Sequence, residues 1–130
     1  MKVSTQYKSP LVLNEIQILE ANFRRSEKAL DDLELGIHVD KSIDQISDEE
    51  YVIILDTTVS DDENKLFVDV KCRGLFKTEQ ENKGLVERNA IAIMFPYIRS
   101  YISMITTQPG MTPIVLPAMN IVAMLDAMDK

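Results

Sequence analysis

The strongest constraint on the fold is an apolar stretch at residues 90–105, AIAIMFPYIRSYISMI. Its apolar side chains recur at helical spacing, and further apolar residues occupy the other helix faces. Arg99 and Ser100 interrupt it, so it lacks the run of about 18 apolar residues typical of a membrane span. We therefore expect a helix covered partly by its own sheet and partly by a second copy of the chain. The face that carries this expectation comprises Ile91, Met94, Phe95, Ile98, Ile102 and Ile105. Pro96 predicts a kink or a restart, because proline lacks an N–H donor.

Length and charge limit the possible partners. The chain has 130 residues, which fits a single domain at 1–130, and a net charge of −7. Nucleic acid and anionic lipid need a basic surface, so we expect neither as a main partner, and we expect no membrane insertion. The first residues show no apolar signal core, which predicts a cytoplasmic protein.

Few residues are suited to catalysis or metal binding. Cys72 is the single cysteine and His38 the single histidine, and the two lie on different predicted strands. The acidic runs lack the glycine and the alternating acids of a calcium loop, and there is no glycine-rich phosphate loop. We therefore expect no enzyme activity, no metal and no cofactor.

Hydrophobic patterning predicts strands followed by helices. The parity of the apolar residues changes within residues 7–20, from Leu11 and Leu13 to Ile16 and Ile18, which predicts a bulge. Asn120 is a candidate N-cap for the last helix. The expected strands are residues 7–20, 33–40, 51–59 and 66–77, and the expected helices are residues 85–106 and 121–130. The expected connections are a surface crossover with a possible short helix at 22–32, an acidic link at 41–50, a turn at 61–64 and an extended apolar segment at 111–118.

Methionine is concentrated near the C-terminus. Five of the seven methionines are Met104, Met111, Met119, Met124 and Met128. Methionine can fill irregular gaps in a core, or it can form a surface that accepts varied apolar partners. Both interpretations stay open, although the position on a loop and a terminal helix favours the second.

Four features near the C-terminus occur in an order that resembles the SecB family of export chaperones. They are the segment IMFPYIRSYISMI, the turn at Gly110, the loop ending in LPAMN and the cap at Asn120. The upstream sequence resembles three strands of that family, in LGIHVDKSIDQISDEEYVIILDTTV and KLFVDVKCRGLF. The resemblance therefore covers nearly the whole chain. It implies an α+β fold, in which a four-stranded antiparallel sheet is packed by a long helix and a short terminal helix. It also implies a homotetramer, a dimer of dimers with the long helices between two eight-stranded sheets, where Val68 and Val70 would join the helix face as interface residues.

The resemblance further implies an ATP-independent holdase that keeps unfolded preproteins competent for export through the Sec pathway. By the resemblance, Glu20 and Asp69 lie on an acidic sheet face that meets the SecA motor. The implied client-binding groove comprises Phe23, Leu30, Met111, Ile114, Leu116, Met119, Ile121, Met124, Leu125 and Met128.

Two departures from the family pattern keep alternatives open. The crossover is short and lacks tryptophan, and the sequence ends at Lys130 without a polar acidic tail. SecB-like proteins that serve toxin–antitoxin pairs are short in a similar way, so a chaperone dedicated to one antitoxin is the first alternative. A small-ligand-binding domain or an enzyme that uses the apolar loop as a pocket is the second.

Overall fold

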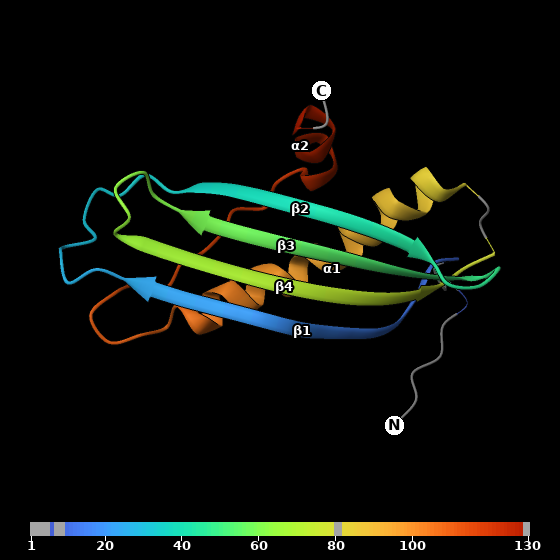
Figure 1. The fold of residues 1–130 in the computed structure, drawn as a ribbon, viewed down its shortest axis with the longest axis horizontal. Coiled ribbons are helices and arrows are strands. Elements are labelled where there is room, and N and C mark those ends of the chain that lie inside the picture. Colours follow the sequence, from blue (N-terminus) through green and yellow to red (C-terminus); the bar gives the residue numbers. More distant parts are fainter. Residues whose placement is uncertain (1–5, 7–9, 80–81, 129–130) are drawn as a thin grey trace.

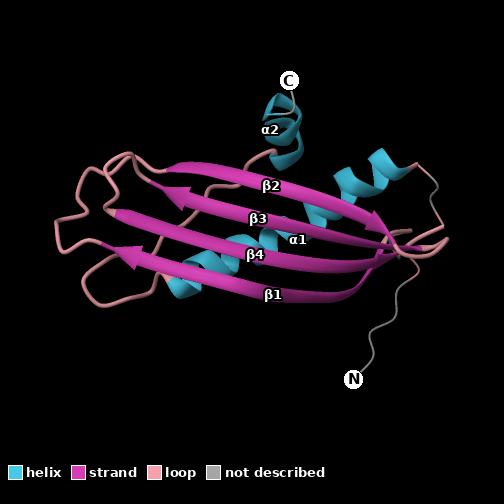
Figure 2. Cartoon of the chain, viewed as in Figure 1, coloured by secondary structure: helices cyan, strands magenta, loops and turns pink. Residues whose placement is uncertain are grey.

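The structure, a computed structural model, describes residue 6 and residues 10–79 and 82–128. Four strands form one antiparallel sheet in the order β1-β4-β3-β2, and α1 crosses one face of it (Figures 1 and 2). The elements are β1 (Val12–Arg25), β2 (Gly36–Gln45), β3 (Glu50–Ser60), β4 (Leu66–Lys77), α1 (Lys83–Ile105) and α2 (Ile121–Met128). The expected four-stranded antiparallel sheet with one long and one short helix is confirmed.

The core lies between α1 and the inner face of the sheet. Along β4 every second residue is buried, as expected for a strand with one face on the core. Gly74 lies under the helix, where a Cβ atom would stand 2.8 Å from the sulfur of Met94. A residue without a side chain therefore lets the helix approach β4 closely. The buried inner residues of β4 are Leu66, Val68, Val70, Cys72, Gly74 and Phe76.

The helix face expected to need a second copy is covered within the chain. Val68 and Val70 are 0% exposed, and the five buried helix residues of that set are at most 3% exposed, while Ile105 is half-buried. The reason given for the oligomer, that one sheet cannot cover this face, is therefore wrong for these residues. The five are Ile91, Met94, Phe95, Ile98 and Ile102. Four accessible apolar residues on one side of α1 form what we call the outer stripe: Ile93, Tyr97, Tyr101 and Met104. Leu85 and Ala92 of α1 are also exposed, outside this stripe.

The predicted bulge in β1 is confirmed. Its pairing with β4 shifts register between Leu13 and Glu15 and again between Ile18 and Glu20. Part of the predicted strand start, residues 7–9, lies outside the described residues.

Two predicted connections are wrong in part, and no short helix forms in the crossover. β1 continues through Asn22–Arg25 and β2 through residues 41–45. Both segments are polar, but each is paired with a neighbouring strand that supplies partners for its backbone. Tertiary pairing therefore overrides local polarity at both sheet edges.

Local hydrogen bonds set the turn and the helix starts. The Asp61 carboxylate accepts hydrogen bonds from the N–H groups of Glu63, Lys65 and Leu66, which closes the predicted turn before β4. The predicted cap is confirmed, because the Asn120 side chain accepts a hydrogen bond from the N–H of Ala123. Of the two outcomes predicted at Pro96, a kink or a restart, the restart is wrong, since α1 runs through Pro96 without interruption. Within the described residues, no helix is both long enough and apolar enough to cross a membrane.

Candidate functional site

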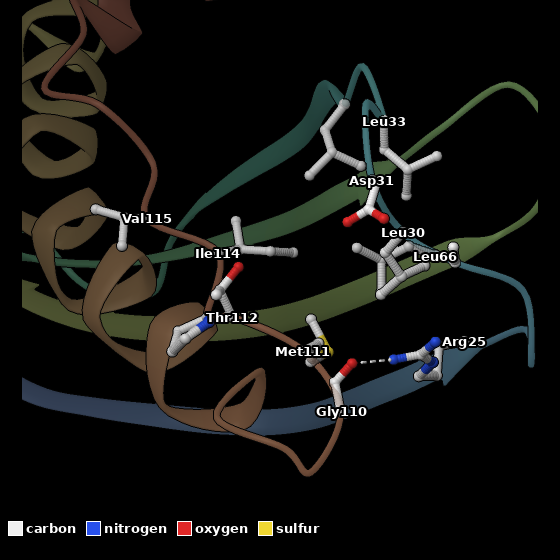
Figure 3. Close-up of a pocket in the computed structure, with 13 residues that line it drawn as sticks. Arg25, Leu30, Asp31, Leu33, Leu66, Gly110, Met111, Thr112, Ile114 and Val115 are labelled. Atoms are coloured by element: carbon white, nitrogen blue, oxygen red, sulfur yellow. Dashed lines mark hydrogen bonds between the residues drawn. The ribbon is translucent and has the colours of Figure 1, made fainter.

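A cavity of about 670 Å³ lies beside the corner where β1 ends and β4 begins (Figure 3). One wall is residues 26–35, between β1 and β2, and from here on the crossover means these residues rather than the predicted 22–32. The other wall is residues 106–120, which we call the connecting segment. Leu66 of β4 and Arg25 of β1 complete it. The lining residues are Arg25, Ala29, Leu30, Asp31, Leu33, Leu35, Leu66, Gly110, Met111, Thr112, Pro113, Ile114 and Val115.

The connecting segment is fixed to the core at Ile114. Its N–H donates to the Thr106 hydroxyl at 2.9 Å, and its carbonyl accepts from the Ser103 hydroxyl at 2.8 Å. The Ile114 side chain is 8% exposed, whereas its neighbour Val115 is 77% exposed. A buried anchor next to exposed apolar residues therefore forms one side of an open cavity that exposes apolar side chains together with nearly as much polar surface.

Arg25 contacts both walls of the cavity. Its Nε donates to the carbonyl of Ser26 at 2.9 Å, and its Nη2 donates to that of Lys28 at 3.1 Å. Its Nη1 donates to the carbonyl of Gly110 at 2.9 Å, on the connecting segment. Gly110 has a φ of +82°, a left-handed conformation that glycine adopts without steric cost.

The structure brings together part of the predicted groove. Leu30, Met111 and Ile114 line the cavity, and Phe23 lines a smaller neighbouring cavity that shares Arg25. The other predicted residues whose side chains the structure describes do not line this 670 Å³ cavity. Leu116, Ile121 and Leu125 are buried, Met119 and Met124 are half-exposed, and the side chain of Met128 lies outside the described residues.

Sequence reasoning missed several lining residues. Leu33 and Leu35 show a strand-like alternation, but they belong to the crossover and face the cavity. Leu66 is 3% exposed and reads as an ordinary core residue of β4. Arg25 carries no sequence signal, because its partners are backbone carbonyls, which every residue possesses.

The last helix is docked by core residues. Ile121 and Leu125 are 5% and 3% exposed, at the spacing of one helix face, and α2 packs on α1. Arg88 and Asp126 add an ion pair of 3.6 Å whose side chains are largely accessible, so it contributes little. Leu125, which the resemblance placed in the client-binding groove, is therefore a core residue, while Met124 remains partly accessible.

Glu20 and Asp69 share the face of the sheet turned away from α1, which we call the open face. Glu20 is opposite Lys71, and Asp69 lies in the next row, opposite Asn22. The Asp69 carboxylate accepts a hydrogen bond of 2.7 Å from Thr58. A neighbouring strand therefore supplies a hydrogen-bond donor to the Asp69 carboxylate. Glu20 is the more exposed carboxylate of the two.

The open face holds a further carboxylate at its centre. Asp56 lies between Lys71 and Asp40 in neighbouring strands. The pKa of Asp56 is raised to about 6. Burial is the largest cause, a hydrogen bond to Asp69 and repulsion from Asp69 and Asp40 add to it, and the charge of Lys71 opposes it. Asp56 therefore takes up a proton at a higher pH than an ordinary aspartate, which reduces the negative charge of this face in mild acid.

The lone cysteine and histidine are on opposite faces of the sheet. Cys72 is fully buried on the inner face, and burial raises the pKa of its thiol to about 11. A thiol in that state is a poor nucleophile. His38 is on the open face, beside Asp40 at 3.1 Å.

Comparisons with known proteins agree with this architecture. The SecB family model, described as preprotein translocase subunit SecB, matches residues 2–129. An uncharacterized protein of Methanocaldococcus jannaschii, MJ0357, is 26% identical over 103 residues, which span 72% of this chain and 66% of that protein.

A solved structure has the same fold. It is the Mycobacterium tuberculosis Rv1957 SecB-like chaperone in complex with a ChAD peptide from the Rv1956 HigA1 antitoxin. The two align with a TM-score of 0.69 and 13% identity, over 84% of this chain and 87% of that one. Since the family model covers nearly every residue, the chain belongs to the SecB family.

Proposed function

We propose that the protein is an ATP-independent chaperone that holds extended apolar segments of unfolded proteins, with the cavity beside Arg25 as a binding site. The observation that carries this proposal is the open cavity between two irregular segments, with leucine, methionine, isoleucine and valine among its lining residues. An unfolded chain offers apolar side chains of varied shape, and flexible methionine and leucine side chains can adapt to them. Met111 is half-buried at the rim and suits this task.

Membership of the SecB family supports unfolded preproteins as clients, kept competent for the Sec pathway. The carboxylates on the open face support SecA as a further partner, because such groups attract a basic surface. The antitoxin peptide bound by the Mycobacterium tuberculosis chaperone supports the alternative, a chaperone dedicated to one antitoxin.

A small-ligand site fits the cavity less well. Such sites usually place a few polar groups that converge on the ligand. Here the Arg25 guanidinium already donates to three backbone carbonyls, and Asp31 and Thr112 are the other charged or hydroxyl-bearing lining residues. The lining therefore favours an apolar segment over a polar metabolite.

We also propose a homotetramer assembled through the outer stripe rather than through the buried helix face. Ile93, Tyr97, Tyr101 and Met104 follow spacings of four, four and three residues, so they lie on one side of α1. Tyr97 and Met104 are 53% and 60% exposed. A continuous apolar stripe of this kind is typical of a surface that a partner covers.

Replacing Met111 by Ser should weaken the binding of an unfolded protein about fivefold, because an apolar side chain at the cavity rim is lost. Met124→Ser tests whether the site extends onto α2, without disturbing the buried Leu125. Light scattering of an aggregating client, measured without ATP, reports the activity. Ile46→Ser is the matched control, since Ile46 is 55% exposed at the far turn. Equal activity of Met111→Ser and the control would contradict the assignment of the cavity.

Introducing Glu at both Tyr97 and Met104 should convert a tetramer into smaller species, because each change places a charge in the outer stripe. Sedimentation equilibrium at micromolar concentration measures the mass. Ile46→Glu adds the same kind of charge elsewhere and should leave the mass unchanged. A monomer of the unmodified protein would refute the tetramer.

Reversing Glu20 and Asp69 to Lys should weaken SecA binding about tenfold at low salt and leave client binding intact. The assay is run at pH 7.5, above the pKa of Asp56. Asp62→Lys with Glu79→Lys gives the same charge change at two exposed positions at strand ends. If the unmodified protein does not bind SecA, the export role fails and the antitoxin-dedicated chaperone becomes the better assignment.

A further inference from the structure

We propose that Arg25 is a positioning residue that sets the width of the client-binding cavity by tying its two walls together. The inference rests on the proposed function, because it concerns the same cavity. It adds a residue outside the predicted groove, one whose contribution is to geometry rather than to apolar contact.

The two walls are irregular and come from distant parts of the chain. The crossover follows β1, and the connecting segment follows α1, so Arg25 and Gly110 are 85 residues apart. Each wall is held to the fold on its own. The N–H of Ser26 donates to the carbonyl of Lys65 at 2.8 Å, and Ile114 bonds to Thr106 and Ser103.

The hydrogen bond from Arg25 to Gly110 joins one wall to the other (Figure 3). Among the described residues it is the only hydrogen bond between the crossover with Arg25 and the connecting segment. It holds the turn between the end of α1 and the anchor at Ile114, a stretch for which the described residues show no second hydrogen bond to the crossover. Without it, the two walls could move apart.

The geometry requires a guanidinium. Its planar, rigid fork directs Nε and Nη2 to the crossover while Nη1 reaches Gly110. No ion pair of Arg25 is found in the described part of the chain, so its charge strengthens these hydrogen bonds to carbonyls. A lysine ammonium donates from a single point and cannot bridge both walls in the same way.

The neighbouring residue offers a matched control. Arg24 alternates with Arg25 along β1 and therefore lies on the open face, with its guanidinium 4.6 Å from the centre of the Phe67 ring. Substituting either arginine removes one positive charge from the same strand. Both arginines line the smaller neighbouring cavity, but only Arg25 lines the 670 Å³ cavity and contacts its two walls.

The experiment compares Arg25→Gln, Arg25→Lys and Arg24→Gln in the full-length protein. Binding of reduced, carboxymethylated α-lactalbumin is measured by fluorescence anisotropy, and amide hydrogen exchange is followed in residues 26–35 and 107–113. Both Arg25 variants should bind about tenfold more weakly and exchange faster in these two segments, as expected for the loss of a charge-assisted hydrogen bond. Arg24→Gln should stay within about twofold of the unmodified protein in binding and should not change the exchange.

Binding by Arg25→Gln equal to that of Arg24→Gln would overturn the proposal. Full rescue by Arg25→Lys would also overturn it, since charge alone would then suffice. Should Arg25→Gln fail to fold by circular dichroism, Gly110→Ala perturbs the same tie from the other side, because its φ of +82° is unfavourable for alanine. Gly110→Ala should weaken binding, and unchanged binding would count against the tie.

The experiment distinguishes a failure of the proposed function from a failure of the proposed role of the Arg25–Gly110 hydrogen bond. If the unmodified protein does not bind the unfolded probe, the chaperone proposal fails. The exchange measurement still decides on the tie in that case, because faster exchange in both walls of Arg25→Gln supports it and unchanged exchange refutes it.

Discussion

The contact between α1 and the inner face of β4 is the interaction on which the rest of the structure depends. The inner face of β4, on which every second residue is buried, packs against the buried face of α1. Gly74 allows the two elements to approach closely. This contact uses one side of each element. The open face of the sheet and the outer stripe of α1 remain available for partners, and the segments that follow β1 and α1 meet at one corner. The cavity is a consequence of that meeting.

Strong periodicity made the centre of the fold predictable. The alternation along residues 66–77 placed each buried residue of β4 correctly, and the parity change in β1 revealed a bulge. The ends of β1 and β2 were not predictable in this way. Their polar residues are held by pairing with β4 and β3, and the stability of such pairs comes from neighbours that the local sequence does not display.

The width of the apolar face on α1 gave a misleading argument about assembly. The most regular helix residues, such as Met94 and Ile98, are covered by the sheet of the same chain. Periodicity alone identifies a buried face without saying which surface buries it. Tyr97 and Met104, which fall outside that regular face, are accessible in the single chain.

The cavity was predictable only where apolar residues occur in loops. Leu30, Met111 and Ile114 were identified through the family resemblance and line it. Leu125 was assigned to the same surface but is buried, since a helix of 8 residues needs its apolar face for docking. The role of Arg25 was not predicted, because a side chain that binds backbone carbonyls leaves no pattern in the sequence.

Methyl NMR of methionine provides the most direct test of the central claim, that an unfolded client binds between the crossover and the connecting segment. The methyl group of Met111 reports on the cavity, while the buried Met94 and Met104 of the outer stripe, neither of which lines the cavity, serve as internal controls. On titration with an unfolded protein, the resonance of Met111 should shift first, and those of Met94 and Met104 should remain in place. Shifts at Met104 with none at Met111 would show that clients bind elsewhere and would contradict the account.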